Sequence, residues 1–192
     1  MVLAAQMGMA THRIALIVGS LRRDSYNRQL ATAVTGLAPS GFSFEPVKID
    51  DLPLYNQDND DAQAAPVKRL KQAIADADAV LFVTPEYNRS IPGVLKNAID
   101  HASRPYGQSA WEGKPAGVIG ASIGAPGSSM AQQHLRNILA YLDMPTLGQP
   151  EVYIHVKDGM FGADGTIADD DTRAFLQQWM DAYVAWVTRL TS

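Results

Sequence analysis

The sequence contains no cysteine among its 192 residues. Disulfides, thiolate nucleophiles, zinc–cysteine sites and iron–sulfur clusters are therefore excluded. Redox chemistry in this chain would need an external cofactor, because no side chain present carries electrons reversibly. The absence also fits a reducing compartment.

The chain also lacks a long apolar segment and an excess of positive charge. No stretch approaches the roughly 20 apolar residues that cross a bilayer. Residues 1–11 are small and apolar without the basic region of a signal peptide, and we interpret them as a loose N-terminal tail. With 16 basic and 20 acidic side chains the net charge is −4, which does not attract nucleic acid or an anionic membrane. We expect a cytoplasmic protein with neither as partner.

Metal-binding patterns and the usual nucleotide fingerprints are missing as well. The four histidines share no short spacing, so we expect no metal site. Neither the G-x-G-x-x-G dinucleotide pattern nor the Gly-Lys-Ser/Thr of a P-loop is present. These absences argue against a classical dinucleotide or ATP site.

What the chain does contain is a regular alternation of apolar runs and amphipathic stretches. Its length suits one domain, at residues 12–192, better than two. Expected strands cover residues 13–19, 42–49, 79–84, 116–121 and 152–156, and the proline- and aspartate-rich stretch 50–61 is expected to be a loop. Expected helices cover residues 26–37, 66–77, 92–102, 130–142 and about 170–190, the last capped by the run Asp169–Asp171. Such alternation predicts a parallel sheet with helices on both faces.

The simplest such architecture is an α/β, doubly wound, flavodoxin-like fold with a five-stranded parallel sheet in the order 2-1-3-4-5. Ligands of these sheets bind at the carboxyl ends of the strands, at the switch point between strands 1 and 3. Three polar or glycine-rich loops follow strands 1, 3 and 4, and they are the candidate binding elements.

The first loop, residues 19–27, offers small hydrogen-bonding groups and one guanidinium. Ser20, Ser25 and Asn27 supply two hydroxyls and an amide, and Arg22 supplies a fork of donors. At the start of a helix, free backbone N–H groups and the helix dipole favour an anion. Such a set suits a phosphate monoester. The alternative is an ordinary polar turn with a helix cap.

The second loop, residues 84–93, has a shape restricted by two prolines, the first of which is Pro85. Tyr87 offers a flat surface for a ring system. Backbone N–H groups near Glu86, Tyr87 and Asn88 suit the polar edge of a flavin, which needs fixed donors where charge develops. In the alternative interpretation Tyr87 is a rim aromatic and Glu86 a solvated charge.

The third loop, residues 122–129, is rich in glycine, which permits close approach of backbone to a ligand. Ser122 and the Gly124 amide are candidates for contact with a ribityl chain or ring. Alone, this loop is as well explained as a simple connector. Together the three loops occupy adjacent strand ends in the order that an FMN site requires.

Two motifs in these loops resemble the NADPH-dependent FMN reductase family, in its chromate and quinone reductase branch. Gly-Ser-x-Arg-x-x-Ser-x-Asn is met by residues 19–27. Pro-Glu-Tyr-Asn-x-Ser-x-Pro-Gly-x-Leu-Lys-Asn-Ala-x-Asp is matched in full by residues 85–100. The resemblance covers about residues 13–190.

The resemblance implies non-covalent FMN, NADPH or NADH as electron donor, and small-molecule acceptors. Quinones, flavins and metal oxyanions such as chromate would be reduced in a ping-pong sequence, with no catalytic side chain because the flavin carries the chemistry. Members are commonly homodimers or homotetramers. By resemblance, Ser20, Arg22, Ser25 and Asn27 would hold the phosphate, while Pro85, Glu86, Tyr87, Asn88, Ser122 and Gly124 would surround the rest of the cofactor.

The third loop departs from the family pattern. Close relatives carry an arginine and a tyrosine that join subunits to a glutamate resembling Glu151. Here Met130 and Gln133 stand at those positions. The tetramer contact of the relatives is therefore absent or built differently.

Two rival hypotheses share the fold. One is a flavodoxin-like electron carrier that binds FMN without turning over nicotinamide. The other is a binding module for a different phosphate, with Asp50 near the end of strand 2 as a ribose-binding acid. Flavin reduction by NADPH or NADH separates the first rival from the enzyme, and FMN uptake separates the second.

Overall fold

The computed structural model describes residues 12–192; the segment 1–11, expected to be a loose tail, lies outside the described residues. The strands are β1 (His12–Val18), β2 (Phe42–Pro46), β3 (Ala79–Val83), β4 (Ala116–Ser122) and β5 (Tyr153–His155). The helices are α1 (Tyr26–Thr35), α2 (Ala65–Ala75), α3 (Gly93–Ala102), α4 (Ser129–Tyr141), α5 (Asp170–Thr191) and the short 3-10 helix η1 (Gln57–Ala62).

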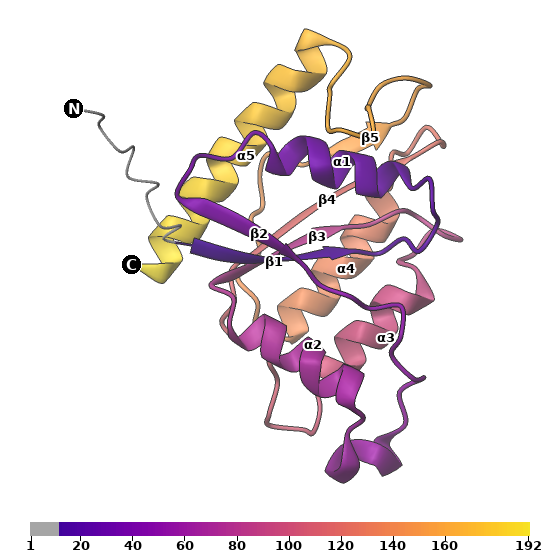
Figure 1. Cartoon of the computed structure of the whole chain (residues 1–192), viewed down its shortest axis with the longest axis vertical. Coiled ribbons are helices and arrows are strands. Elements are labelled where there is room, and N and C mark those ends of the chain that lie inside the picture. The colour runs from indigo at the N-terminus through magenta and orange to yellow at the C-terminus, as the bar shows by residue number, and fades with distance from the viewer. Residues whose placement is uncertain (1–11) are drawn as a thin grey trace, which may run out of the picture.

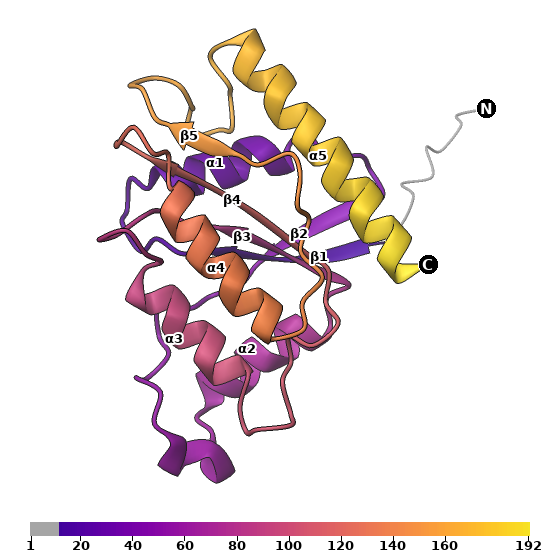
Figure 2. The same cartoon turned by 180° about the vertical axis from the view of Figure 1, so that it is seen from behind.

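The five strands form one parallel sheet in the order β2-β1-β3-β4-β5, which confirms the predicted flavodoxin-like fold. Helices α1 and α5 cover one face and α2, α3 and α4 cover the other (Figures 1 and 2). Strands β1 and β3 are adjacent but not consecutive, so the chain reverses its direction of winding between them. The carboxyl ends of β1, β3 and β4 consequently meet at one edge.

Alternation along each strand divides the core into two layers. On the α1/α5 side Ile14 and Leu16 of β1 join a cluster with Leu30 of α1 and Trp179 of α5. On the other side Ile17 packs with residues of α2, α3 and α4. A sheet that is buried on both faces requires near-continuous apolar strands, and β3 is buried at every position.

Three aromatic residues at helical spacing in α5 serve packing. Trp179 and Tyr183 are fully buried in α5 and stack with ring centroids 5.2 Å apart, while Trp186 is half-buried. Burial raises the pKa of the Tyr183 phenol well above its ordinary value. These rings anchor α5 to the sheet rather than to a ligand.

Several element boundaries differ from the expectation. The stretch 50–61 is not wholly a loop, because η1 begins at Gln57, where the Asn56 side chain accepts from the Asp58 N–H. β2 ends at Pro46 instead of residue 49, with one further hydrogen bond from Val47 N–H to Leu16 O. β5 spans three residues instead of five. The asparagine cap that begins η1 and the proline at the end of β2 are features that apolar periodicity does not register.

Candidate cofactor-binding site

A cavity of about 240 Å³ opens where β1, β3 and β4 end. It brings together eight of the ten residues that the sequence singles out: Ser20, Arg22, Ser25, Asn27, Pro85, Glu86, Tyr87 and Ser122. Asn88 and Gly124 do not line it, whereas Tyr26, Ala121 and Ile123 do. Three segments far apart in the sequence therefore form a single concave surface.

The first loop is arranged as an anion cradle. Ser25 caps α1, its hydroxyl accepting from the Arg28 N–H at 3.3 Å. Ser20 is 5% exposed and its hydroxyl has no partner among the described residues. None of the N–H groups of residues 20–25 donates to another described residue either. These unpaired donors lie at the start of a helix, where the dipole favours negative charge, so this loop is suited to hold an anionic oxygen cluster.

Asn27 fixes this loop to the neighbouring strand end. Its side-chain amide donates to Ala121 O and accepts from Ala121 N–H, both at 2.9 Å, and the residue is 3% exposed. The bonds tie the start of α1 to β4 across 94 positions of sequence. One N–H of the amide is left for a ligand.

Arg22 is exposed at the cavity rim. Its guanidinium lies over the Tyr26 ring, 5.3 Å from the ring centroid. A guanidinium stacked on an aromatic ring keeps its in-plane donors free. Tyr26 therefore holds Arg22 beside the cradle, a role that sequence patterns did not indicate, although the tyrosine directly follows the capping serine.

The second loop contains a tight turn at residues 87–90. Tyr87 and Ser90 exchange backbone hydrogen bonds, and the two residues between them, Asn88 and Arg89, have φ of 52° and 64°. A positive φ at both central positions is the pattern of a type I′ turn. The turn directs Asn88 away from the cavity and presents Tyr87, which is 50% exposed, at its mouth.

The Glu86 carboxylate is not a solvated loop charge. It is bound to backbone N–H groups, and so it is not free to approach a flavin ring. One carboxylate oxygen accepts from the N–H groups of Met130 and Ala131, at 3.0 and 3.2 Å. These are first-turn donors of α4, whose own cap residue Ser128 makes no side-chain capping bond. Glu86 thus caps α4 from another loop, a placement that the helix dipole favours.

The third loop lines the cavity with its first two residues, Ser122 and Ile123. Ser122 Oγ accepts from the Gly124 N–H at 3.1 Å, so that N–H is already used within the loop. Ile123 between them is 73% exposed and lines the cavity. The cavity therefore has a polar, donor-rich end at β1 and an apolar, open end flanked by Tyr87 and Ile123.

Comparisons with known proteins agree with this geometry. Residues 12–159 match the model of a family described as NADPH-dependent FMN reductase. The chain belongs to the NADPH-dependent FMN reductase family. It is accordingly an enzyme of the flavin-dependent oxidoreductase type, with FMN as cofactor and NAD(P)H as electron donor.

Individual relatives of this FMN reductase cover nearly its full length. A 2-hydroxy-1,4-benzoquinone reductase from a Burkholderia species is 57% identical over 175 residues, which is 91% of this chain and 96% of the relative. A quinone reductase from Pseudomonas putida is 51% identical over 178 residues, 92% and 95% of the two chains. Among solved structures, FerB, an NAD(P)H:(acceptor) oxidoreductase from Paracoccus denitrificans, superposes with a TM-score of 0.89 at 46% identity, covering 93% of this chain and 98% of FerB.

The cavity of the FMN reductase fits FMN in its chemistry. The partnerless Ser20 hydroxyl and the free N–H groups of residues 20–25 form the donor set that a phosphate monoester requires. The apolar end beside Tyr87 and Ile123 suits an aromatic ring.

The substitution Arg22→Ala is expected to weaken FMN binding by about 1.5–3 kcal/mol, the scale of a hydrogen bond to a charged group. Arg22 lies outside the core, so the fold should be unaffected. Quenching of FMN fluorescence on addition to apoprotein measures the affinity. Arg173→Ala, an exposed change in the first turn of α5, is the control. Equal affinity for the two variants would rule out a phosphate role for Arg22.

Proposed function

We propose that this enzyme reduces quinones and free flavins with electrons from NADPH or NADH, in a ping-pong sequence on FMN held in the β1/β3/β4 cavity. One observation carries the proposal: a donor-rich cradle and an open apolar mouth belong to the same small cavity. Donor and acceptor would use this one mouth in turn, which is the basis of the proposed ping-pong order.

The proposed roles follow the geometry of each loop. Bound FMN supplies two-electron transfer, accepting from nicotinamide and passing electrons to the acceptor. Ser20, Arg22 and Ser25 hold its phosphate, and Asn27 positions the loop through Ala121. Pro85 and the Glu86 N–H would lie beside the ring of bound FMN, and the Glu86 carboxylate keeps the second loop fixed to α4.

Tyr87 and Ile123 are proposed to form the walls between which the substrates enter. Both are at least half exposed at the cavity mouth. An exposed aromatic beside a ring site favours stacking of a flat, apolar acceptor, which is the shape of a quinone. The names of the Burkholderia and Pseudomonas relatives support the same substrate class. Chromate is proposed as a secondary acceptor, because no described residue in the mouth forms a dedicated oxyanion site.

Steady-state kinetics tests the sequence of events. With NADPH varied at several fixed concentrations of 1,4-benzoquinone, the double-reciprocal lines should be parallel. Intersecting lines would show that donor and acceptor bind together and would contradict the ping-pong order. No oxidation of NADPH or NADH would instead favour a flavodoxin-like electron carrier.

We also propose that residues 12–192 act as one FMN-binding domain in a cytoplasmic homodimer or homotetramer. No helix in residues 12–192 is long and apolar enough to cross a membrane.

The Gln133 amide donates to Glu151 and Tyr153, each at 2.9 Å, so Glu151 is already bound within its own chain. Burial raises the pKa of the Tyr153 phenol above its ordinary value, and the hydrogen bond with Glu151 raises it further. A subunit contact through Glu151 would therefore differ from that of relatives.

A further inference from the structure

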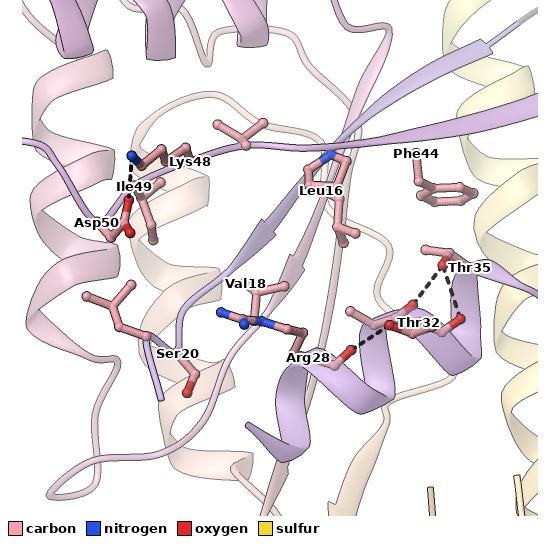
Figure 3. A pocket seen from close by; sticks show the side chains of 14 residues that line it. Leu16, Val18, Ser20, Arg28, Thr32, Thr35, Phe44, Lys48, Ile49 and Asp50 are labelled. Atoms are coloured by element: carbon pink, nitrogen blue, oxygen red, sulfur yellow. Dashed lines mark hydrogen bonds and ion pairs between the residues drawn. The ribbon is translucent and has the colours of Figure 1, made fainter. Parts of the chain in front are cut away.

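A second hollow lies beside the cofactor cavity, between α1 and the outer strand β2 (Figure 3). Its volume is about 500 Å³, about twice that of the cofactor cavity. Leu16 and Val18 of β1 form its floor, and Phe44 of β2 forms a wall. Ser20 lines both hollows, so the two meet at the cradle of the first loop.

The hollow follows from the way α1 is anchored. The two Asn27–Ala121 hydrogen bonds hold the start of α1 toward β4, and the helix packs over β4, β3 and β1. β2 lies on the far side of β1 and is left without a helix on this face. Phe42 and Phe44 are accordingly only half-buried. The hollow therefore results from the position in which the fold holds α1, and it is not a packing defect.

The charges around the hollow favour an anion. Arg28 extends from α1 toward Val18 in the middle of the hollow (Figure 3), and it makes no ion pair with any carboxylate in residues 12–192. Lys48, at the same rim, is already engaged by Asp50 at 3.7 Å and by Asp51 at 3.4 Å. The uncompensated charge is thus positive and lies beside apolar walls.

Apart from the Ser20 hydroxyl, which belongs also to the cradle of the first loop, the remaining polar side chains of the hollow have partners. The Thr32 hydroxyl donates to Arg28 O at 3.1 Å, and the Thr35 hydroxyl donates to Ala31 O at 2.8 Å. The hollow therefore offers one aromatic wall, aliphatic surfaces and one free guanidinium. The matching ligand has a flat aromatic ring system that can stack on Phe44, with a phosphate attached.

The electron donor, NAD(P)H, has such a part in its adenosine-phosphate half. When its nicotinamide ring reaches the mouth of the cofactor cavity, its adenosine half lies outside that cavity, which is too small for both. We propose that the β2/α1 hollow binds the adenosine-phosphate half of NAD(P)H, with the adenine against Phe44 and a phosphate paired with Arg28. This inference rests on the proposed function, since it requires nicotinamide to bind beside the flavin.

Reduction of the FMN-loaded enzyme under anaerobic conditions tests the proposal. Flavin absorbance is followed in a stopped-flow instrument at increasing NADPH, for the wild type, Arg28→Gln and Phe44→Ala. Arg173→Gln, which removes an exposed arginine that does not line the hollow, is the matched control. Each of the two hollow variants should raise the NADPH concentration for half-maximal rate roughly tenfold, the scale of one lost charged hydrogen bond or ring contact. The limiting rate and the FMN affinity should not change.

A donor without adenosine separates this inference from the proposed function. N-benzyl-1,4-dihydronicotinamide should reduce wild type and both hollow variants with the same concentration dependence. A loss confined to NADPH would assign Arg28 to the 2′-phosphate, and an equal loss with NADH would assign it to the pyrophosphate. Variants that respond to NADPH like Arg173→Gln would overturn the inference while leaving the proposed function intact. Failure of every donor with wild type would overturn the proposed function itself.

Discussion

The substitution Asn27→Ala is expected to lower the free energy of unfolding of the apoprotein by about 3 kcal/mol. The change removes both hydrogen bonds to Ala121 and leaves a buried backbone N–H and a buried C=O without partners, each at a cost of about 1–3 kcal/mol. Urea denaturation of the FMN-free protein measures the difference. The apoprotein is the informative form, because a residue that only binds phosphate would leave its stability unchanged.

Asn137→Ala is the matched control, since Asn137 is an exposed residue of α4 with no side-chain hydrogen bond in the described residues. Its unfolding free energy should stay within about 0.5 kcal/mol of wild type. If Asn27→Ala behaved like the control, Asn27 would be a ligand residue only. The anchoring of α1 to β4 would then need another explanation.

Gly120→Ala should destabilise the protein by about 3 kcal/mol or more, at the upper end of the range for overpacked cores. Gly120 lies in β4, and a methyl group there would overlap the Thr84 carbonyl oxygen and Ser128 Oγ. Neither atom belongs to a flexible chain end, because Thr84 closes β3 and Ser128 is fully buried with a φ of 73°. Relief requires β3 and β4 to separate where the cofactor cavity begins.

The same substitution should therefore lower FMN affinity together with stability. Thermal denaturation and flavin content of the purified protein report the two effects. Gly148→Ala is the control, because Gly148 is exposed and a methyl group there meets no atom within 4 Å. A Gly120→Ala variant that melts like the control would show that β3 and β4 can move apart without cost.

The sequence alone predicts the fold well because the strongest physical signals are repetitive. The runs that became β1, β3 and β4 are apolar on both faces, and the helices between them have one apolar stripe. Parallel strands joined by helices leave few topologies, and the observed order is the one expected. Residue type and position also predict a cap within the run Asp169–Asp171, and Asp169 is the residue that caps α5.

The site is predicted less completely, because side-chain direction depends on contacts between distant segments. The roles of Asn27 and Glu86 each involve a backbone group 44 or more positions away, which no local pattern reveals. Asn88 has the residue type of a ligand but lies in a turn that points it elsewhere. The hollow at Arg28 follows from the hydrogen bonds that hold the start of α1 toward β4, and these bonds exist only in the folded sheet.

The visible spectrum of the purified protein, recorded before and after anaerobic addition of NADPH, tests both the FMN site and the proposed enzyme. We expect a yellow protein with the absorption bands of oxidised flavin, which disappear on addition of the donor and return with a quinone. A colourless protein that does not take up added FMN would contradict the assignment of the β1/β3/β4 cavity. A yellow protein that neither NADPH nor NADH bleaches would contradict the proposed enzyme.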